Sequence, residues 1–154
     1  MTLRLAPLLL IVSAMAQESR PALTAAEKEF EQSMSGVTLN GHFTRQDGSG
    51  LREEKYGIEK VTKVKDGLWR FDARFQYGGH DVKMPIELEV KWAGDTPVIT
   101  LTDQPVAGLG SFTVRIVIYR GQYAGTWSDA NGHGGQMFGS IVKSAQEDAV
   151  VASG

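Results

Sequence analysis

The chain has 154 residues, with 16 Lys and Arg against 18 Asp and Glu, and therefore a formal net charge of −2. The basic residues are dispersed among acidic ones, which argues against a nucleic-acid partner because phosphate binding needs concentrated Lys and Arg. The absence of cysteine excludes disulfides, thiolate metal sites and lipid attachment through an N-terminal cysteine.

The N-terminus predicts an export signal. Arg4 supplies a positive start, residues 5–13 an apolar segment, and residues 14–16 (Ala-Met-Ala) a cleavage site of small residues. We therefore predict a signal peptide over residues 1–16 and a location in the periplasm or outside the cell. The 138 of 154 residues that remain suit a single domain. No second apolar run follows, so no transmembrane helix is expected.

A short helix is predicted over residues 25–34. Thr24 and Glu27 have the spacing of a capping box, in which each side chain accepts a hydrogen bond from the other residue's amide. Phe30 and Met34 lie four residues apart and form an apolar stripe on one face. The stripe indicates that the helix docks on the rest of the domain.

From residue 37 onward, apolar and polar side chains alternate with period two, which is typical of strands with one dry and one wet face. Glycine-containing pairs separate the alternating runs and predict tight hairpin turns. We expect eight strands, over residues 37–45, 52–64, 68–77, 80–92, 97–103, 111–120, 122–128 and 135–142.

Short links make consecutive strands antiparallel neighbours. A meander of this length closes most economically as an all-β, eight-stranded, antiparallel up-and-down barrel, and a β-sandwich is the alternative.

Residues 46–51 and 104–110 are predicted as longer loops, which carry function more often than tight turns do. Pro85 predicts a sheet edge or a bulge in the fourth strand, because proline cannot donate a ladder hydrogen bond. The expected organisation is a signal peptide (1–16), a leader with the short helix (17–36), the barrel domain (37–142) and a flexible tail (143–154).

Specific catalytic motifs are absent from the sequence. It contains neither the nucleophile elbow G-x-S-x-G nor the phosphate-binding G-x-x-x-x-G-K-[ST], and its three histidines are too far apart in the chain to predict a metal site. No catalytic residue, metal or cofactor is therefore predicted. We interpret Glu53 and Glu54, like Glu87 and Glu89, as outward-facing strand charges in cross-strand ion pairs.

The leading hypothesis is a non-catalytic binding or structural module whose partner is a small apolar ligand or a cell-envelope protein. Candidates for lining a pocket in the barrel are six aromatic residues, Trp69, Tyr77, Trp92, Tyr119, Tyr123 and Trp127. Aromatic residues at period two also suit a packed core, which is the competing interpretation. One alternative function is a protein-interaction module that uses exposed strand faces. The other is a small hydrolase or isomerase, which needs His80 or His133 beside Asp81, Asp103 or Asp129.

The stretch YAGTWSDANGHGGQMFG, residues 123–139, is predicted to be the last hairpin, with Trp127 covering one barrel end. Its Gly125-Thr126-Trp127 resembles the Gly-x-Trp of lipocalins and avidin-like barrels. Those families carry the motif on the first strand instead of the seventh, so the resemblance implies barrel packing alone.

A second resemblance covers residues 84–139. The segments VKWAGDTPVI, GLG-F and YAGTW…GG-FG are similar to a family of small exported bacterial β-proteins of unknown function. This resemblance implies a shared β fold and export, and it implies no activity.

Overall fold

The computed structural model describes residues 20–77 and 80–144. The predicted signal peptide, the predicted turn at residues 78–79 and residues 145–154 of the predicted tail lie outside this range. One helix, α1 (Ala25–Ser33), precedes eight strands. The strands are β1 (Val37–Thr44), β2 (Leu51–Lys65), β3 (Leu68–Tyr77), β4 (His80–Ala93), β5 (Thr96–Val106), β6 (Gly110–Tyr119), β7 (Gln122–Asp129) and β8 (Gly134–Lys143).

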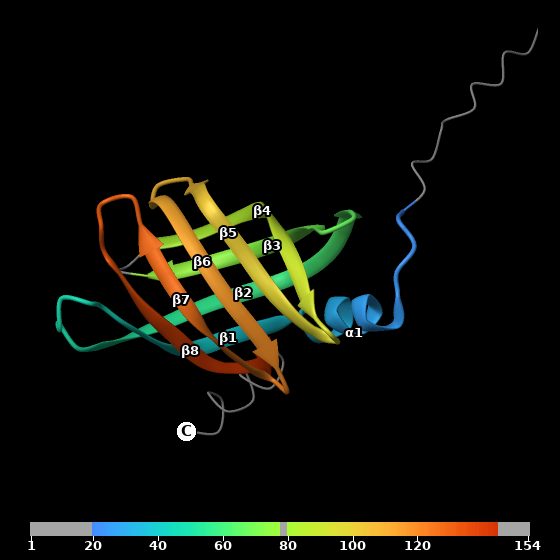
Figure 1. Cartoon of the computed structure of the whole chain (residues 1–154), viewed down its shortest axis with the longest axis horizontal. Helices are drawn as coiled ribbons and strands as arrows, with labels where there is room; N and C mark the ends of the chain where they lie inside the picture. Colours follow the sequence, from blue (N-terminus) through green and yellow to red (C-terminus); the bar gives the residue numbers. More distant parts are fainter. Residues whose placement is uncertain (1–19, 78–79, 145–154) are drawn as a thin grey trace, which may run out of the picture.

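The strands form one closed antiparallel barrel in up-and-down order (Figure 1). Each strand pairs with the next along the chain, and β1 pairs with β8 to close the sheet. The predicted fold class is therefore confirmed, and the sandwich alternative is wrong. Period-two alternation places one face of each strand toward the lumen, where the apolar side chains collect.

Register shifts interrupt this alternation within β2 and within β5. In β2 the register with β3 shifts between Ile58 and Lys60, so even-numbered side chains face inward before the bulge and odd-numbered ones after it. In β5 the register with β6 shifts between Leu101 and Gln104. The predicted loop at 104–110 is wrong in its first half, because β5 resumes after its bulge and runs to Val106.

Helix α1 closes one end of the barrel, beside the turn between β4 and β5 (Figure 1). The predicted capping box is present: the Thr24 hydroxyl accepts from the Glu27 amide at 3.2 Å, and the Glu27 carboxylate accepts from the Thr24 amide at 2.8 Å. Phe30 and Met34 are buried, as their spacing predicts. The ring of Phe30 makes edge contacts with three rings of the barrel, those of Trp69, Phe71 and Trp92, at centroid distances of 5.1, 6.2 and 5.8 Å.

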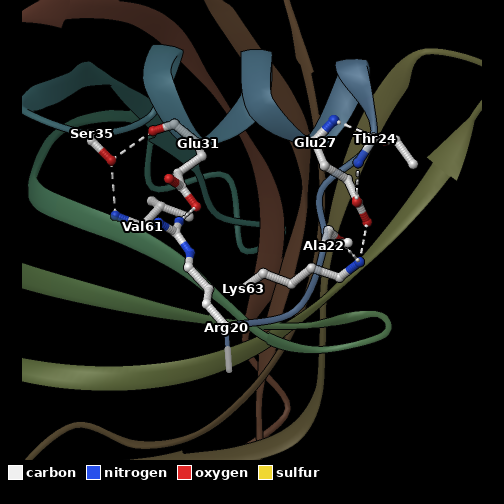
Figure 2. A network of polar contacts seen from close by, with 8 residues as sticks. All are labelled: Arg20, Ala22, Thr24, Glu27, Glu31, Ser35, Val61 and Lys63. Carbon is white, nitrogen blue, oxygen red and sulfur yellow. Dashed lines mark hydrogen bonds and ion pairs between the residues drawn. The ribbon is translucent and has the colours of Figure 1, made fainter. Parts of the chain in front are cut away.

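A polar network fastens the same helix to β2 (Figure 2). Lys63 is buried beneath α1, with its Nζ 2.7 Å from the Glu27 carboxylate and 3.2 Å from that of Asp66. Burial raises the pKa of Glu27, but the hydrogen bonds from Lys63 and Thr24 outweigh it and hold that pKa below the usual value. The hydroxyl of Ser35 adds a bridge, since it accepts from the Val61 amide at 2.9 Å and donates to the Glu31 carbonyl at 2.7 Å.

The ladder between β4 and β5 is short. It joins Glu89–Ala93 to residues 96–100, whereas residues 81–88 of β4 pair with β3 alone. Pro85 lies in this half-paired stretch, with its side chain exposed. The prediction that Pro85 marks an edge is therefore consistent with the pairing, which leaves a seam in the barrel wall between residues 81–88 of β4 and residues 101–106 of β5.

No helix within the described residues is long or apolar enough to cross a bilayer.

Phe30→Ala is expected to destabilise the protein by about 3–5 kcal/mol, because it removes the ring that packs against three aromatic residues at the α1 end and leaves a cavity there. Urea unfolding followed by circular dichroism measures the loss. Phe138→Ala is the control, since Phe138 is on the outer face with 43% of its surface exposed; it should cost less than about 1 kcal/mol. Equal losses for the two variants would contradict the assignment of Phe30 as the seal.

Candidate functional site

The lumen holds a cavity of about 360 Å³, within the range of roughly 300 to 1,000 Å³ typical of small-molecule sites. Phe30, Trp69 and Val61 fill the α1 end, and the cavity occupies the rest of the lumen. Its wall is mainly aliphatic and aromatic, including Leu39, Ile58, Phe71, Phe75, Ile86, Leu88, Ile99, Leu101, Phe112, Val114, Ile116 and Met137. An interior of this kind is neither filled by its own side chains nor polar.

One carboxylate lines the apolar cavity. Glu54, on β2, accepts hydrogen bonds from two phenols, at 2.8 Å from Tyr123 to Oε1 and at 2.9 Å from Tyr56 to Oε2. The interpretation of Glu54 as an outward charge is therefore wrong, whereas Glu53, Glu87 and Glu89 are exposed as predicted. The β2 bulge is the physical reason, because it reverses which alternate residues of that strand face the lumen.

Two glycines place Tyr123 against the barrel wall. Gly41 on β1 and Gly139 on β8 are paired, and Tyr123 on β7 is paired with Gly139. A Cβ on Gly41 would lie 2.3 Å from the Tyr123 hydroxyl and 2.2 Å from the Phe138 carbonyl oxygen, and one on Gly139 would lie 2.8 Å from the Tyr123 ring. The ring can lie across these strands to reach Glu54 only because neither position carries a side chain.

The environment shifts the pKa values of this cluster upward. Burial raises the pKa of Glu54, and the hydrogen bonds from Tyr123 and Tyr56 offset only part of that shift. Burial and the charge of Glu54 also raise the pKa values of both tyrosines, so the two phenols remain protonated and keep donating. A titratable group held in a cavity with a shifted pKa is a candidate functional residue.

The opposite end of the cavity is lined by Phe43 on β1, by Trp127 on β7 and by Arg45. Trp127 packs edge-on against Phe43 at 5.6 Å, and its indole nitrogen donates to the Thr44 carbonyl at 3.1 Å. Arg45, directly after β1, also lines the cavity, with its Nε 3.2 Å from the Asp47 carboxylate. The described part of this end therefore contains an aromatic wall and a paired cation.

The six predicted aromatic residues occupy different places. Trp127 lines the cavity, and Tyr123 is buried and contributes through its bond to Glu54. Trp69 and Trp92 pack on Phe30 at the α1 end. Tyr119 is on the outer face, 54% exposed, with Arg120 5.3 Å from its ring centroid. The side chain of Tyr77 lies outside the described residues.

Among the candidates whose side chains the structure describes, no histidine or aspartate lines the cavity. His133 Nδ1 lies 2.9 Å from the Asp129 carboxylate at the tip of the last hairpin, where the same carboxylate accepts from the amides of Asn131 and His133. This arrangement closes a turn, and neither residue lines the cavity. Asp81 pairs with Arg74, and Asp103 is exposed and contacts Thr113. The side chain of His80 lies outside the described residues.

Sequence reasoning missed Glu54, Tyr56 and Arg45. A signal for the first two was present, because Tyr56 and Ile58 are even-numbered apolar positions and Val61 is an odd-numbered one. That change of phase indicates a bulge, and it places Glu54 inside with Tyr56. No comparable pattern marks Arg45.

Gly41→Ala is expected to cost about 1–3 kcal/mol, because the added methyl group overlaps a backbone carbonyl and the Tyr123 hydroxyl. Gly57→Ala is the matched control on a neighbouring strand, where the nearest atom would lie at an ordinary 3.5 Å. Denaturant unfolding compares the two. A neutral Gly41→Ala would contradict the position of the Tyr123 ring.

The stability of Glu54→Gln relative to the wild type is expected to rise with pH. Because the folded-state pKa of Glu54 is raised, its ionisation opposes folding, and the wild type loses stability as pH increases through that pKa. Urea unfolding between about pH 4 and pH 8 measures the difference. Glu53→Gln removes an equal charge from an exposed neighbour and controls for net charge. A difference that shrinks with rising pH would contradict the buried state of Glu54.

Comparisons with known proteins add no family to this description. No protein-family model, curated protein or solved structure matches the chain. The closed eight-stranded barrel is compatible with the lipocalin-like resemblance at the level of fold, and the resemblance to small exported bacterial proteins stays a prediction.

Proposed function

We propose that this protein is an exported, non-catalytic binding barrel that holds one small, mainly apolar ligand in its lumen. The observation that carries the proposal is the apolar cavity of about 360 Å³ inside the closed sheet. The export part of the proposal rests on the signal-peptide pattern of residues 1–16.

The shape of the lumen supports binding over a purely structural role. Interiors of stable domains are close-packed, and an unfilled space loses the dispersion contacts of the atoms around it. At the α1 end, Phe30 and Trp69 are buried, pack against each other and do not line the cavity, so this sequence fills the lumen there with its own side chains. The unfilled remainder is lined by apolar side chains and a few polar groups, as ligand sites are.

Access to the cavity follows from the same geometry. The α1 end is sealed, whereas Phe43, Leu109 and Phe112 line the cavity at the opposite end without being fully buried. The seam between β4 and β5 also borders the cavity, because Leu88 and Leu101 from its two sides both line it. A ligand would therefore enter away from α1.

Nile red, a neutral apolar dye, tests the proposal. The wild type should bind one dye molecule per chain with a rise in fluorescence. Val114→Phe should weaken binding by about tenfold or more, because the larger side chain occupies the cavity.

Val117→Phe on the same strand is the control. Val117 is on the outer face with 43% of its surface exposed, so this variant should bind the dye as the wild type does. Unfolding curves for both variants establish that they are folded. Failure of the wild type to bind, or equal binding by wild type and Val114→Phe, would refute the proposal.

A further inference from the structure

Glu54 is a carboxylate in an apolar cavity without a cation beside it. Among the ion pairs of the described residues, none includes Glu54; His42 on the neighbouring strand contributes an electrostatic attraction to its ionised form. The surrounding wall is aliphatic and aromatic on every other strand that lines the cavity. Buried charges in proteins are normally paired, since an isolated one loses its hydration without compensation.

The two phenols beside Glu54 determine what chemistry the cluster offers. Each donates its single proton to one carboxylate oxygen, so neither has a donor left for a ligand. The carboxylate oxygens and the phenol oxygens all retain free lone pairs. The cluster therefore presents hydrogen-bond acceptors and negative charge to the cavity, and it would repel a ligand carboxylate or phosphate.

We propose that the ligand is an amphipathic amine, with an apolar body that fills the lumen and one ammonium group that pairs with Glu54. This inference rests on the proposed binding function and specifies the ligand class. The ammonium supplies the missing cation and donates to the free lone pairs, while the apolar body contacts the wall around Phe71 and Ile116. Such a charge-assisted pair in an apolar site is stronger than the same pair in water.

Arg45 is the other charged group of the cavity and suggests the opposite ligand charge. Its position differs in one respect from that of Glu54, because the Asp47 carboxylate lies 3.2 Å from its Nε. Arg45 therefore has a counter-charge from this chain, although its buried Nε makes no hydrogen bond, whereas Glu54 has two hydrogen bonds and no counter-charge among the described residues. Glu54 is therefore the cavity charge for which a ligand would supply the counter-charge.

Displacement of Nile red by three ligands with the same ten-carbon chain tests the proposal. Decylamine, decanol and decanoate should displace the dye from the full-length protein in that order of affinity. Decylamine should be favoured over decanol by at least about tenfold, as expected for a close charge pair. Equal affinities, or the tightest binding by decanoate, would overturn the amine assignment while leaving apolar binding intact.

Variants locate the ammonium. Glu54→Gln should lower decylamine affinity to the decanol affinity measured in the same variant, and Glu53→Gln, with the same loss of charge, should retain the preference for decylamine. If decylamine affinity survives Glu54→Gln, or falls equally in Glu53→Gln, the pairing is wrong. Tyr123→Phe provides a second variant that keeps the carboxylate, and at a pH above the pKa of Glu54 it should retain the preference for the amine; loss of that preference there would also overturn the pairing.

The pH dependence of decylamine affinity, compared with that of decanol affinity, distinguishes a Glu54 that binds the ammonium from a Glu54 with a structural role alone. Decylamine affinity should fall as pH decreases through the pKa of Glu54, because protonation removes the charge that holds the ammonium. Decanol affinity should stay constant over the same range. A parallel fall for both ligands would indicate a change of structure and would count against the proposal.

Discussion

Closure of the barrel between β1 and β8 is the constraint on which the cavity depends. Gly41 and Gly139 face each other across this ladder, and a Cβ on either would overlap backbone atoms of the opposite strand. The same bare backbone gives the Tyr123 ring its path across the wall to Glu54. The two glycines therefore serve the closed sheet and the polar cluster at once, so that the fold and the candidate site share one structural requirement.

The buried charge at the α1 end of the lumen is paired with opposite charges, whereas the buried charge in the cavity is not. Beneath α1, Lys63 meets Glu27 and Asp66, and the pairing fastens the helix that seals the barrel. Further along the lumen, Glu54 has two phenol donors and no cationic partner within residues 20–77 and 80–144. The charge of Lys63 is paired by carboxylates of the same chain, and its role in stability explains it. The Glu54 carboxylate opposes folding when it is ionised, and such a group is better explained by a function than by packing.

Much of the architecture could be predicted because it is encoded locally. The capping box at Thr24, the four-residue spacing of Phe30 and Met34, and the alternation along β3 and β4 each depend on neighbours in the chain. The cavity could not be predicted in this way, since it depends on how side chains from distant strands fill a shared volume. The orientation of Glu54 was predicted wrongly for a different reason. One extra residue near Glu59 reverses which alternate side chains of β2 face the lumen. The alternation on one side of the bulge does not reveal the reversal; the patterns on its two sides must be compared.

The seam between β4 and β5 has a consequence for association between chains. An unpaired stretch of strand exposes amide and carbonyl groups that can add a strand from another molecule, which is how many β proteins aggregate. Pro85 lacks an amide proton in the middle of this stretch, and its exposed neighbours two residues away on either side are Lys83 and Glu87. A strand from another molecule would find no amide donor at Pro85 and would have to pack beside the charged side chains of Lys83 and Glu87. The barrel can thus leave part of its wall unpaired without offering a template for intermolecular β-sheet.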